Sequence, residues 1–220
     1  MSVLNVENLS FSFGDKPVLK NISFALQKGE HAGLVGINGA GKTTFFNILM
    51  GNLVPDEGSV YKSSSINIGY LDQHSEFNKE YSIKDWLKSA FDKLYLIERK
   101  MIKISDSMSC TNSDSEKMKK LLNEYGKFQD RLDRSDFYKI DSLIENVARG
   151  LGLYQLGMDT SVDKLSGGQR TKLKLAKLLL MNPDLLLLDE PTNYLDKEHI
   201  DWLADHLNNY PNSFIVISHD

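Results

Sequence analysis

Apolar residues recur with different spacings along the chain, and each spacing predicts a different kind of element. Up to residue 71 the apolar positions form short runs, partly alternating with polar ones and separated by turn residues such as Gly14 and Pro55. This spacing is typical of β-strands. It predicts strands at 2–13, 18–27, 32–35, 59–62 and 66–71, with the strand at 32–35 buried. A short helix is predicted after the third strand, ending at Gly51.

From Ser82 onward glycines are absent over a long stretch, and the apolar spacing becomes that of paired helices. Steps of three and four alternate over two segments, which is typical of the heptad seam of a coiled coil. The first seam is Ala90, Leu94, Ile97, Met101, Ile104 and Met108, and the second is Met118, Leu121, Tyr125, Phe128 and Leu132. We expect an antiparallel hairpin that projects from the body, with a first helix on the order of 35–40 Å long. The alternative is two amphipathic helices packed flat on the core.

The last part of the chain alternates helices with short apolar strands. Helices are predicted at 136–150, 170–181 and 196–208, and strands at 184–189 and 213–217. Four consecutive leucines lie between Pro183 and Asp189, which is typical of a strand buried on both faces. The sequence therefore predicts one α/β domain that carries a helical insertion.

Composition and charge limit the cellular compartment and the class of binding partner that we expect for this protein. The 220 residues are 41% hydrophobic with a net charge of −4, so the surface as a whole is not basic, although a local patch can still contact nucleic acid. The single cysteine, Cys110, cannot form an intrachain disulfide. The first thirty residues have no apolar signal-peptide core, and polar residues interrupt the most apolar stretch, 173–188. We expect a soluble, cytoplasmic protein.

The strongest chemical motif lies between a predicted strand and a predicted helix. Gly36, Gly41, Lys42 and Thr43 fit the pattern G-x-x-x-x-G-K-[ST]. Glycines let the backbone wrap around phosphates with its N–H groups inward, and the helix N-terminus adds positive charge. Lys42 can reach the β- and γ-phosphates, and the Thr43 hydroxyl can ligate Mg²⁺. A dinucleotide-binding loop does not fit because its third glycine would fall on Thr44. A glycine turn without a ligand is the weaker alternative.

Two further motifs accompany this phosphate loop. Asp189 and Glu190 follow the leucine strand at its carboxyl end, where α/β folds bind ligands. Asp189 is suited to Mg²⁺, and Glu190 to polarising the water that attacks a γ-phosphate. A serine and two glycines within 165–169 precede a helix and offer a second phosphate-binding surface. Taken alone, the first motif also fits a plain acidic strand end, and the second a simple N-cap.

In order and spacing, these motifs resemble those of ABC-type ATPases over the whole chain, except for the details of the helical hairpin. The resemblance implies a P-loop NTPase fold, with an antiparallel β subdomain and a helical subdomain carrying a coiled-coil-like hairpin. It implies ATP and Mg²⁺ as ligands. It also implies a composite site, in which the signature motif at 165–169 acts on ATP held by the phosphate loop of a partner domain.

The resemblance also assigns roles to single residues. The implied catalytic residues are Glu190, His219 and Lys42, and the implied metal contacts are Thr43, Gln73 and Asp189. The implied nucleotide contacts are Phe13, Gly36, Ile37, Asn38, Gly39, Ala40, Gly41, Lys42, Thr43, Thr44, Gln73, Leu165, Ser166, Gly167, Gly168, Gln169 and Asp196. His219 would be the switch histidine at the γ-phosphate, Gln73 the Q-loop glutamine, and Asp196 part of the D-loop at the dimer interface. Phe13 matches the aromatic position that stacks on adenine, with Phe11 as the alternative; either also fits a core strand.

Finer features resemble the ABC-F subfamily, whose members have no transmembrane partner and work on the ribosome. Residues 190–196 are similar to the subfamily's E-P-T-N-H-L-D, with Tyr194 in place of the usual histidine. Residues 169–179 resemble its signature helix, and the predicted hairpin lies where ABC-F proteins carry an arm. We expect the departure at Tyr194 to leave hydrolysis intact.

The ABC-F resemblance implies a longer protein with two ATPase domains. We expect residues 1–220 to be the first of them, truncated after the switch histidine, with the helical and arm insertion at 82–150. The implied partners are a second ABC domain, in the same full-length chain or in a homodimer, and the ribosome with its rRNA and tRNA, without membrane insertion. The isolated fragment is expected to bind ATP weakly and hydrolyse it slowly, because each half-site needs the other.

Other functions stay open at the level of the sequence. An ATPase subunit of a membrane transporter shares the motifs, although its helical region is usually shorter and lacks sustained heptads. A nucleotide-gated clamp for another protein or DNA also carries an inserted coiled coil, usually a far longer one. The ABC-F branch is open too, between a translation factor and an antibiotic-resistance protein. Basic and acidic residues are mixed along the hairpin sequence and identify no RNA surface by themselves.

Overall fold

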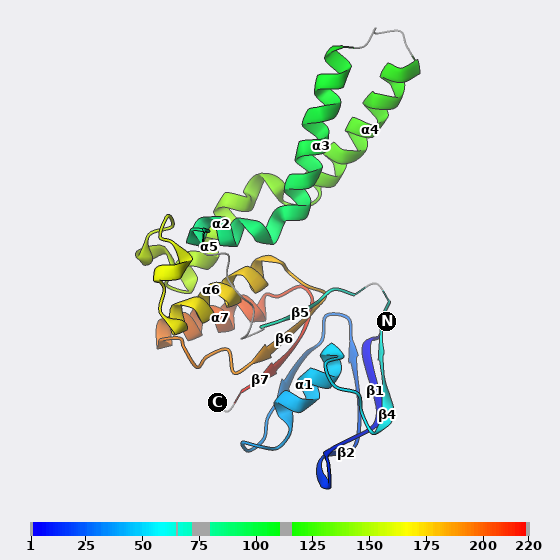
Figure 1. Ribbon diagram of the computed structural model, residues 1–220, viewed down its shortest axis with the longest axis vertical. Coiled ribbons are helices and arrows are strands. Elements are labelled where there is room, and N and C mark those ends of the chain that lie inside the picture. The colour runs from blue at the N-terminus through cyan, green and yellow to red at the C-terminus, as the bar shows by residue number, and fades with distance from the viewer. Residues whose placement is uncertain (1, 65, 72–79, 111–115, 219–220) are drawn as a thin grey trace.

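The computed structural model describes residues 2–64, 66–71, 80–110 and 116–218. Figure 1 shows a body containing two sheets, a layer of helices against it, and a helical hairpin that extends away from both. An antiparallel sheet, a parallel sheet and a helical subdomain are present, which confirms the α/β fold with antiparallel and helical subdomains that the resemblance implies. The boundaries of most predicted elements agree with the structure to within three residues.

The antiparallel sheet contains β1 (Ser2–Phe13), β2 (Lys16–Gln27) and β4 (Glu57–Lys62) in the order β2-β1-β4. Val6 lies opposite Phe24 of β2 and Val60 of β4. Gly58 has a positive φ of 82°, and a Cβ there would collide with the carbonyl oxygen of Glu7 on β1. A glycine is therefore required for β4 to approach β1.

The parallel sheet contains β3 (His31–Leu34), β5 (Ile68–Tyr70), β6 (Leu185–Asp189) and β7 (Ser213–Ile217) in the order β3-β7-β6-β5. The four leucines of β6 are fully buried, which confirms the prediction from their sequence. Leu185 and Leu187 pack into the core shared with β1 and the first helix, whereas Leu186 and Leu188 pack into the core of the helical layer. The strand therefore joins the two hydrophobic cores.

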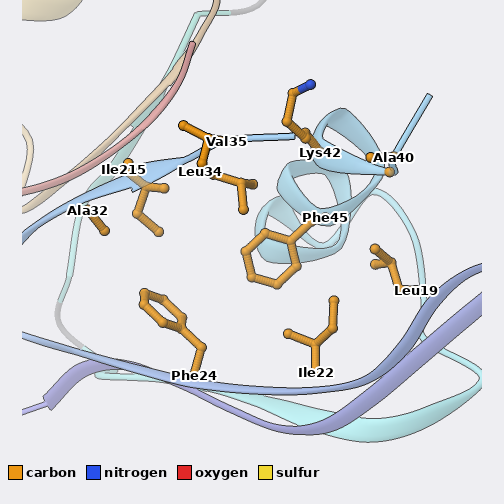
Figure 2. Close-up of a pocket in the computed structure, with 12 residues that line it drawn as sticks. Leu19, Ile22, Phe24, Ala32, Leu34, Val35, Ala40, Lys42, Phe45 and Ile215 are labelled. Atoms are coloured by element: carbon orange, nitrogen blue, oxygen red, sulfur yellow. The ribbon is translucent and has the colours of Figure 1, made fainter. Parts of the chain in front are cut away.

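The prediction that the strand at 32–35 is buried is wrong. β3 lies at the edge of the parallel sheet, alternate residues of it are exposed, and Val35 beyond it is 76% exposed. An apolar groove of about 260 Å³ lies between β2, β3 and α1 (Lys42–Met50). Figure 2 shows Ile22, Phe24 and Phe45 pointing into this space. Strand order depends on pairing between distant segments, so the local sequence could not place β3 at an edge.

The helical subdomain covers the face of the parallel sheet opposite the one that packs against α1 and β1. It comprises α2 (Ile83–Lys88), α5 (Ile140–Gly150), α6 (Gly167–Leu180) and α7 (Lys197–Asn208), with 3-10 turns at Ser89–Phe91, Phe137–Lys139, Tyr154–Leu156 and Val162–Lys164. Helix α6 begins three residues before the predicted start at Arg170. Its N-cap is Ser166, whose hydroxyl accepts a hydrogen bond from the Gln169 N–H, while the Gln169 side chain accepts one from the Ser166 N–H.

The hairpin consists of α3 (Asp92–Ser109) and α4 (Glu116–Asp133), which we call the arm. The two helices lie side by side and project from the body, so the alternative of flat packing on the core is wrong (Figure 1). The most buried arm residues, Ile97, Ile104 and Leu132, all belong to the predicted seams. The first helix is shorter than expected, about 27 Å for 18 residues, because the 3-10 turn Ser89–Phe91 separates it from α2.

Candidate functional site

The glycine-rich loop connects β3 to α1. Gly41 occupies the N-cap of α1 with a φ of 91°, and a Cβ there would lie 2.7 Å from Cγ1 of Val18. Both the backbone conformation and the close approach of β2 therefore require a glycine at this position. The ammonium of Lys42 donates hydrogen bonds to the carbonyl oxygens of Gly36 (2.7 Å) and Ile37 (3.2 Å), so its side chain folds back across the loop.

The start of α1 meets the end of β6. The Thr43 hydroxyl donates a hydrogen bond to Oδ2 of Asp189 at 2.8 Å, although the two residues are 146 positions apart. A hydroxyl and a carboxylate are ligands of the kind that Mg²⁺ prefers. In the described part of the chain no three His, Cys, Asp or Glu side chains are grouped to hold a metal. Two oxygen ligands, such as those of Thr43 and Asp189, suit an ion that takes its remaining ligands from phosphate and water, as nucleotide-bound Mg²⁺ does.

Glu190 follows Asp189 in an unusual backbone conformation. Its φ is +49°, a left-handed value that costs an L-residue free energy unless neighbours hold it. Its N–H donates to the Ile217 carbonyl of β7 (3.0 Å), and its carbonyl accepts from the Asn193 N–H (3.3 Å). These two bonds fix the direction in which the side chain leaves the strand end.

One cavity of about 670 Å³ gathers nine of the twenty predicted site residues. Its lining residues are Phe13, Lys16, Pro17, Val18, Asn38, Gly39, Gly41, Lys42, Thr43, Thr44, Asp189, Glu190 and Asn193. The volume is in the range of small-molecule and cofactor sites. Sequence reasoning missed Lys16, Pro17, Val18 and Asn193 as lining residues. Lys16, Pro17 and Val18 could have been suspected because the β1–β2 turn that follows Phe13 must lie beside it.

The two candidate aromatic residues have different surroundings. Phe13 is 56% exposed at the rim of the cavity, whereas Phe11 is 7% exposed and belongs to the core of the antiparallel sheet. Their rings meet edge to face with centroids 5.0 Å apart. Phe13 therefore has a free ring face for a planar ligand, and the buried Phe11 does not.

The segment 165–169 lies apart from this cavity, since none of its residues lines it. Leu165 is buried, Ser166 and Gln169 form the capping box of α6, and no heavy atom outside its immediate neighbourhood lies within 4 Å of the Cβ position of Gly167. The simple N-cap interpretation is thus correct for the contacts within this chain. Such a cap still presents exposed N–H groups at a helix N-terminus.

The remaining predicted site residues are more scattered. Gly36, Ile37 and Ala40 belong to the loop but do not line this cavity; Ile37 is exposed to solvent, and Ala40 lines the apolar groove of Figure 2. Asp196 is the exposed N-cap residue of α7 and lies 3.8 Å from the Lys172 ammonium. Gln73 and His219 lie outside the described residues.

The sequence matches a known protein family. The family model described as ABC transporter matches residues 19–193, which include the phosphate loop, the segment 165–169 and the Asp189–Glu190 pair. The chain is an ABC ATPase domain. Domains of this family bind ATP together with Mg²⁺, generally hydrolyse it, and pair with a second ATPase domain.

Relatives of this ABC domain are longer proteins. An uncharacterized ABC transporter ATP-binding protein of Bacillus subtilis, YfmM, is 54% identical over the whole chain, which covers 42% of YfmM. ABC transporter F family member 5 of Arabidopsis thaliana is 34% identical over the whole chain and 32% of its own length. The energy-dependent translational throttle protein EttA of Mycobacterium tuberculosis is 31% identical over 99% of the chain and 38% of its own length. The chain thus spans less than half of these relatives.

A solved structure, the ATP-binding subunit of an ABC transporter, superposes on 99% of this ABC domain with a TM-score of 0.66 at 20% identity, covering 79% of that subunit. At this identity the likeness establishes the fold alone. None of the helices in the described part of the ABC domain is both long and apolar enough to cross a bilayer.

Proposed function

We propose that this ABC domain is the first of two ATPase domains in an ABC-F protein that acts on the ribosome, and that ATP hydrolysis moves its arm. The names of ABC transporter F family member 5 and of EttA support the subfamily and a role in translation. The length of the relatives leaves room for a second ATPase domain. In this proposal the protein is cytoplasmic, and the arm belongs to an insertion at 82–150.

In the proposed mechanism the residues of the large cavity act on ATP. Phe13 stacks on the adenine, and the N–H groups of the phosphate loop surround the phosphates. The Lys42 ammonium gives up its hydrogen bonds to the carbonyl oxygens of Gly36 and Ile37 and donates to phosphate oxygens instead. Thr43 and Asp189 would hold Mg²⁺, which would supply positive charge to neutralise the phosphates. Glu190 accepts the proton of the attacking water. Gln73 and His219 complete the site at the γ-phosphate.

The separation between the cavity and the segment 165–169 fits a composite site. N–H groups at the start of α6 that cannot reach the chain's own nucleotide are available to ATP held by a second domain. Residues 165–169 and Asp196 therefore face the partner domain in this proposal. An isolated domain, with half of each site, is expected to hydrolyse ATP slowly.

The observation that carries the ribosomal role is a separation of charge on the arm. We define the basic face by position relative to the seam residues. Along the first helix it comprises the positions one before and two after Leu94, Met101 and Met108. Along the second helix it comprises the positions one before and two after Met118, Tyr125 and Leu132. These positions hold Lys93, Leu96, Lys100, Lys103 and Ser107 on α3 with Cys110 directly after it, and Lys117, Lys120, Glu124, Lys127 and Arg131 on α4 with Arg134 directly after it. All of them are exposed. Eight basic side chains against one carboxylate give a net formal charge of +7.

The two halves of the basic face lie on the same flank of the arm. In an antiparallel helix pair, the positions just before the first seam residue of each heptad flank the same side of the seam. The Lys100 ammonium accordingly lies 6.0 Å from the ring centroid of Phe128 across the seam. The remaining charged residues of the arm are Asp92, Glu98, Asp106, Glu116, Asp130 and Asp133, with Arg99 and Lys119. Charges that are mixed along the sequence are thus segregated in space.

A basic stripe on a projecting rod suits contact with a phosphate backbone, because each neutralised phosphate releases counterions. The test compares two double charge reversals in the full-length protein. Lys120→Glu with Lys127→Glu changes the basic face, and Arg99→Glu with Lys119→Glu makes the same charge change elsewhere on the arm. We expect the first pair to weaken ribosome binding roughly tenfold or more at 0.1 M salt, and the second about twofold or less.

Equal effects of the two pairs would contradict the proposed role of the basic face. Retention of the unaltered protein by membranes rather than ribosomes would favour the alternative, an ATPase subunit of a transporter. A protein or DNA that co-purifies in place of ribosomes would favour the nucleotide-gated clamp.

A further inference from the structure

A second cavity lies in the helical layer, between α5 and α7 and over the carboxyl end of α6. Its volume is about 470 Å³, and none of its lining residues lines the large cavity that gathers the nucleotide site. Figure 1 shows α5, α6 and α7 together below the arm. The volume is in the range of pockets that take a ligand. We call this cavity the α5–α7 groove.

The floor of the groove is apolar. Val147, Leu179 and Leu180 are buried there, and Leu143 lines the groove while 37% exposed. The hydroxyl of Tyr210, which also lines the groove, already donates to the carbonyl oxygen of Pro183 at 2.7 Å. The floor therefore offers apolar contact, and the half-covered leucine is surface that another apolar group can remove from water.

One face of α7 forms a wall of the groove. The lining residues on this face follow one another at spacings of three and four, and they are Trp202, Asp205, His206 and Asn209. The Trp202 and His206 rings stack at an angle of 24° with centroids 5.0 Å apart, and both residues are only partly buried. Partly exposed aromatic rings attract a cation or a planar group.

The charge of the groove is negative. No lysine or arginine lines it, whereas Asp136 and Asp205 do. The Asp136 carboxylate pairs with the Lys139 ammonium at 2.8 Å, but the Asp205 carboxylate has no ion pair among the described residues. Burial lowers the pKa of His206, so its ring is neutral at pH 7 and adds no positive charge. A cation that enters the groove thus meets a carboxylate without a cation of its own.

Arginine is the basic side chain that matches this chemistry. Its guanidinium is planar, stacks on aromatic rings and can donate two parallel hydrogen bonds to one carboxylate. Trp202 and Asp205 are three residues apart on one helix face, so a single guanidinium can meet both. The ammonium of lysine is compact and strongly hydrated, and it gains less from a ring. A nucleic-acid backbone does not fit, because its phosphates would be repelled.

We propose that the α5–α7 groove docks a basic segment of a partner protein, with an arginine stacked on Trp202 and paired with Asp205. An apolar side chain next to that arginine covers the floor beside Leu143. The inference goes beyond the proposed function, because the groove shares no lining residue with the large cavity and does not include the basic face of the arm. The basic face suits phosphates, whereas the groove suits a cationic protein segment.

The test uses the full-length protein and a fluorescein-labelled peptide of sequence RLGRLG, with fluorescence anisotropy as the readout. We expect saturable binding that Asp205→Asn weakens roughly fivefold or more, because the carboxylate loses its charge. Asp201→Asn is the matched control, since it removes the same charge from an exposed residue of α7 that does not line the groove. It should change the affinity about twofold or less.

Two further comparisons test the ring contact. Trp202→Phe keeps an aromatic side chain with a weaker attraction for cations and should weaken binding about threefold. The peptide KLGKLG keeps the charge of RLGRLG without its planar groups, and the unaltered protein should bind it about fivefold more weakly. ATP binding by the Asp205→Asn and Trp202→Phe proteins should match that of the unaltered protein, because neither residue lines the large cavity.

Several results would overturn the proposal. One is the absence of saturable RLGRLG binding by the unaltered protein, and another is an equal loss for Asp205→Asn and Asp201→Asn. Equal affinity for KLGKLG would mean that charge alone attracts the peptide, without a stacked arginine. Loss of ATP binding together with peptide binding would assign Asp205 a purely structural role. Displacement of the peptide by a short single-stranded RNA would point to a nucleic acid as the occupant.

Discussion

The hydroxyl of Thr43 and Oδ2 of Asp189 are 2.8 Å apart, joined by a hydrogen bond between the first turn of α1 and the end of β6. This bond shows that two motifs separated by most of the chain present their oxygens at one point. It also means that Thr43 must release Asp189, or share it, when a cation arrives. Both residues are therefore expected to matter for Mg²⁺ more than for the nucleotide itself.

Asp189→Asn should weaken the binding of Mg²⁺–ATP roughly tenfold or more, because a neutral amide is a poorer ligand and loses the attraction to the cation. Binding of ATP in EDTA should change about twofold or less. Titration calorimetry with and without Mg²⁺ measures both. Equal losses in the two conditions would mean that Asp189 acts on the fold or the nucleotide rather than on the metal.

Phe13→Ala should lower the affinity for ATP about five- to a hundredfold, the loss expected when a base loses its stacking partner. Phe13→Tyr keeps an aromatic ring at the cavity rim and should bind normally. Phe11→Ala provides the contrast, since removal of a buried phenylalanine should destabilise the fold by about 3–5 kcal/mol. If Phe13→Ala binds ATP unchanged, the adenine lies elsewhere.

The phosphate loop and β6 could be predicted because local pattern determines them. Closely spaced glycines followed by Lys42 and Thr43 have one common use, and four leucines before Asp189 need burial on both faces. The exposed edge at β3 could not be predicted, because the neighbours of a strand are chosen among distant segments. Lys16 carries no motif, and only the β1–β2 turn places it at the cavity.

Some features of the arm could be predicted from the sequence, and others could not. The heptad seams predicted a hairpin because the apolar period is a local property. Its charge segregation could not be seen in the order of residues, because it depends on which flanks of two antiparallel helices share a side. The break at Ser89–Phe91 was also missed, since Ala90 continues the seam through a 3-10 turn.

Ile104→Ala should loosen the arm selectively, because Ile104 is buried in the seam and its truncation costs about 2–5 kcal/mol. Amide hydrogen exchange should accelerate in α3 and α4, while ATP binding in the distant cavity stays unchanged. Ile102→Ala is the matched control, since that residue is 54% exposed on the same helix. Similar exchange rates for the two variants would contradict the seam.

Burial lowers the pKa of His206 below its usual range. The folded protein therefore binds a proton at His206 less readily than the unfolded chain, whose histidine has a pKa near 6.5. The stabilising contribution is present above about pH 6.5 and is lost as pH falls below it.

His206→Phe should reduce the loss of thermal stability between about pH 7.5 and pH 5.5. It removes the titrating group and keeps a ring beside Trp202, on which His206 stacks with centroids 5.0 Å apart. His31→Phe is the control, because His31 also stacks on an aromatic ring but is exposed. Parallel melting curves for the His206 variant and the unaltered protein at both pH values would disprove the assignment.

In the proposed function, Glu190 drives hydrolysis in a ribosome-bound ATPase. The most direct test of this role is sucrose-gradient sedimentation of the full-length Glu190→Gln protein with ribosomes, in ATP and in ADP. We expect the variant to bind ATP, to hydrolyse it at least a hundredfold more slowly, and to remain with the ribosomes in ATP but not in ADP. Normal hydrolysis by the variant, or sedimentation away from ribosomes in both nucleotides, would contradict the account.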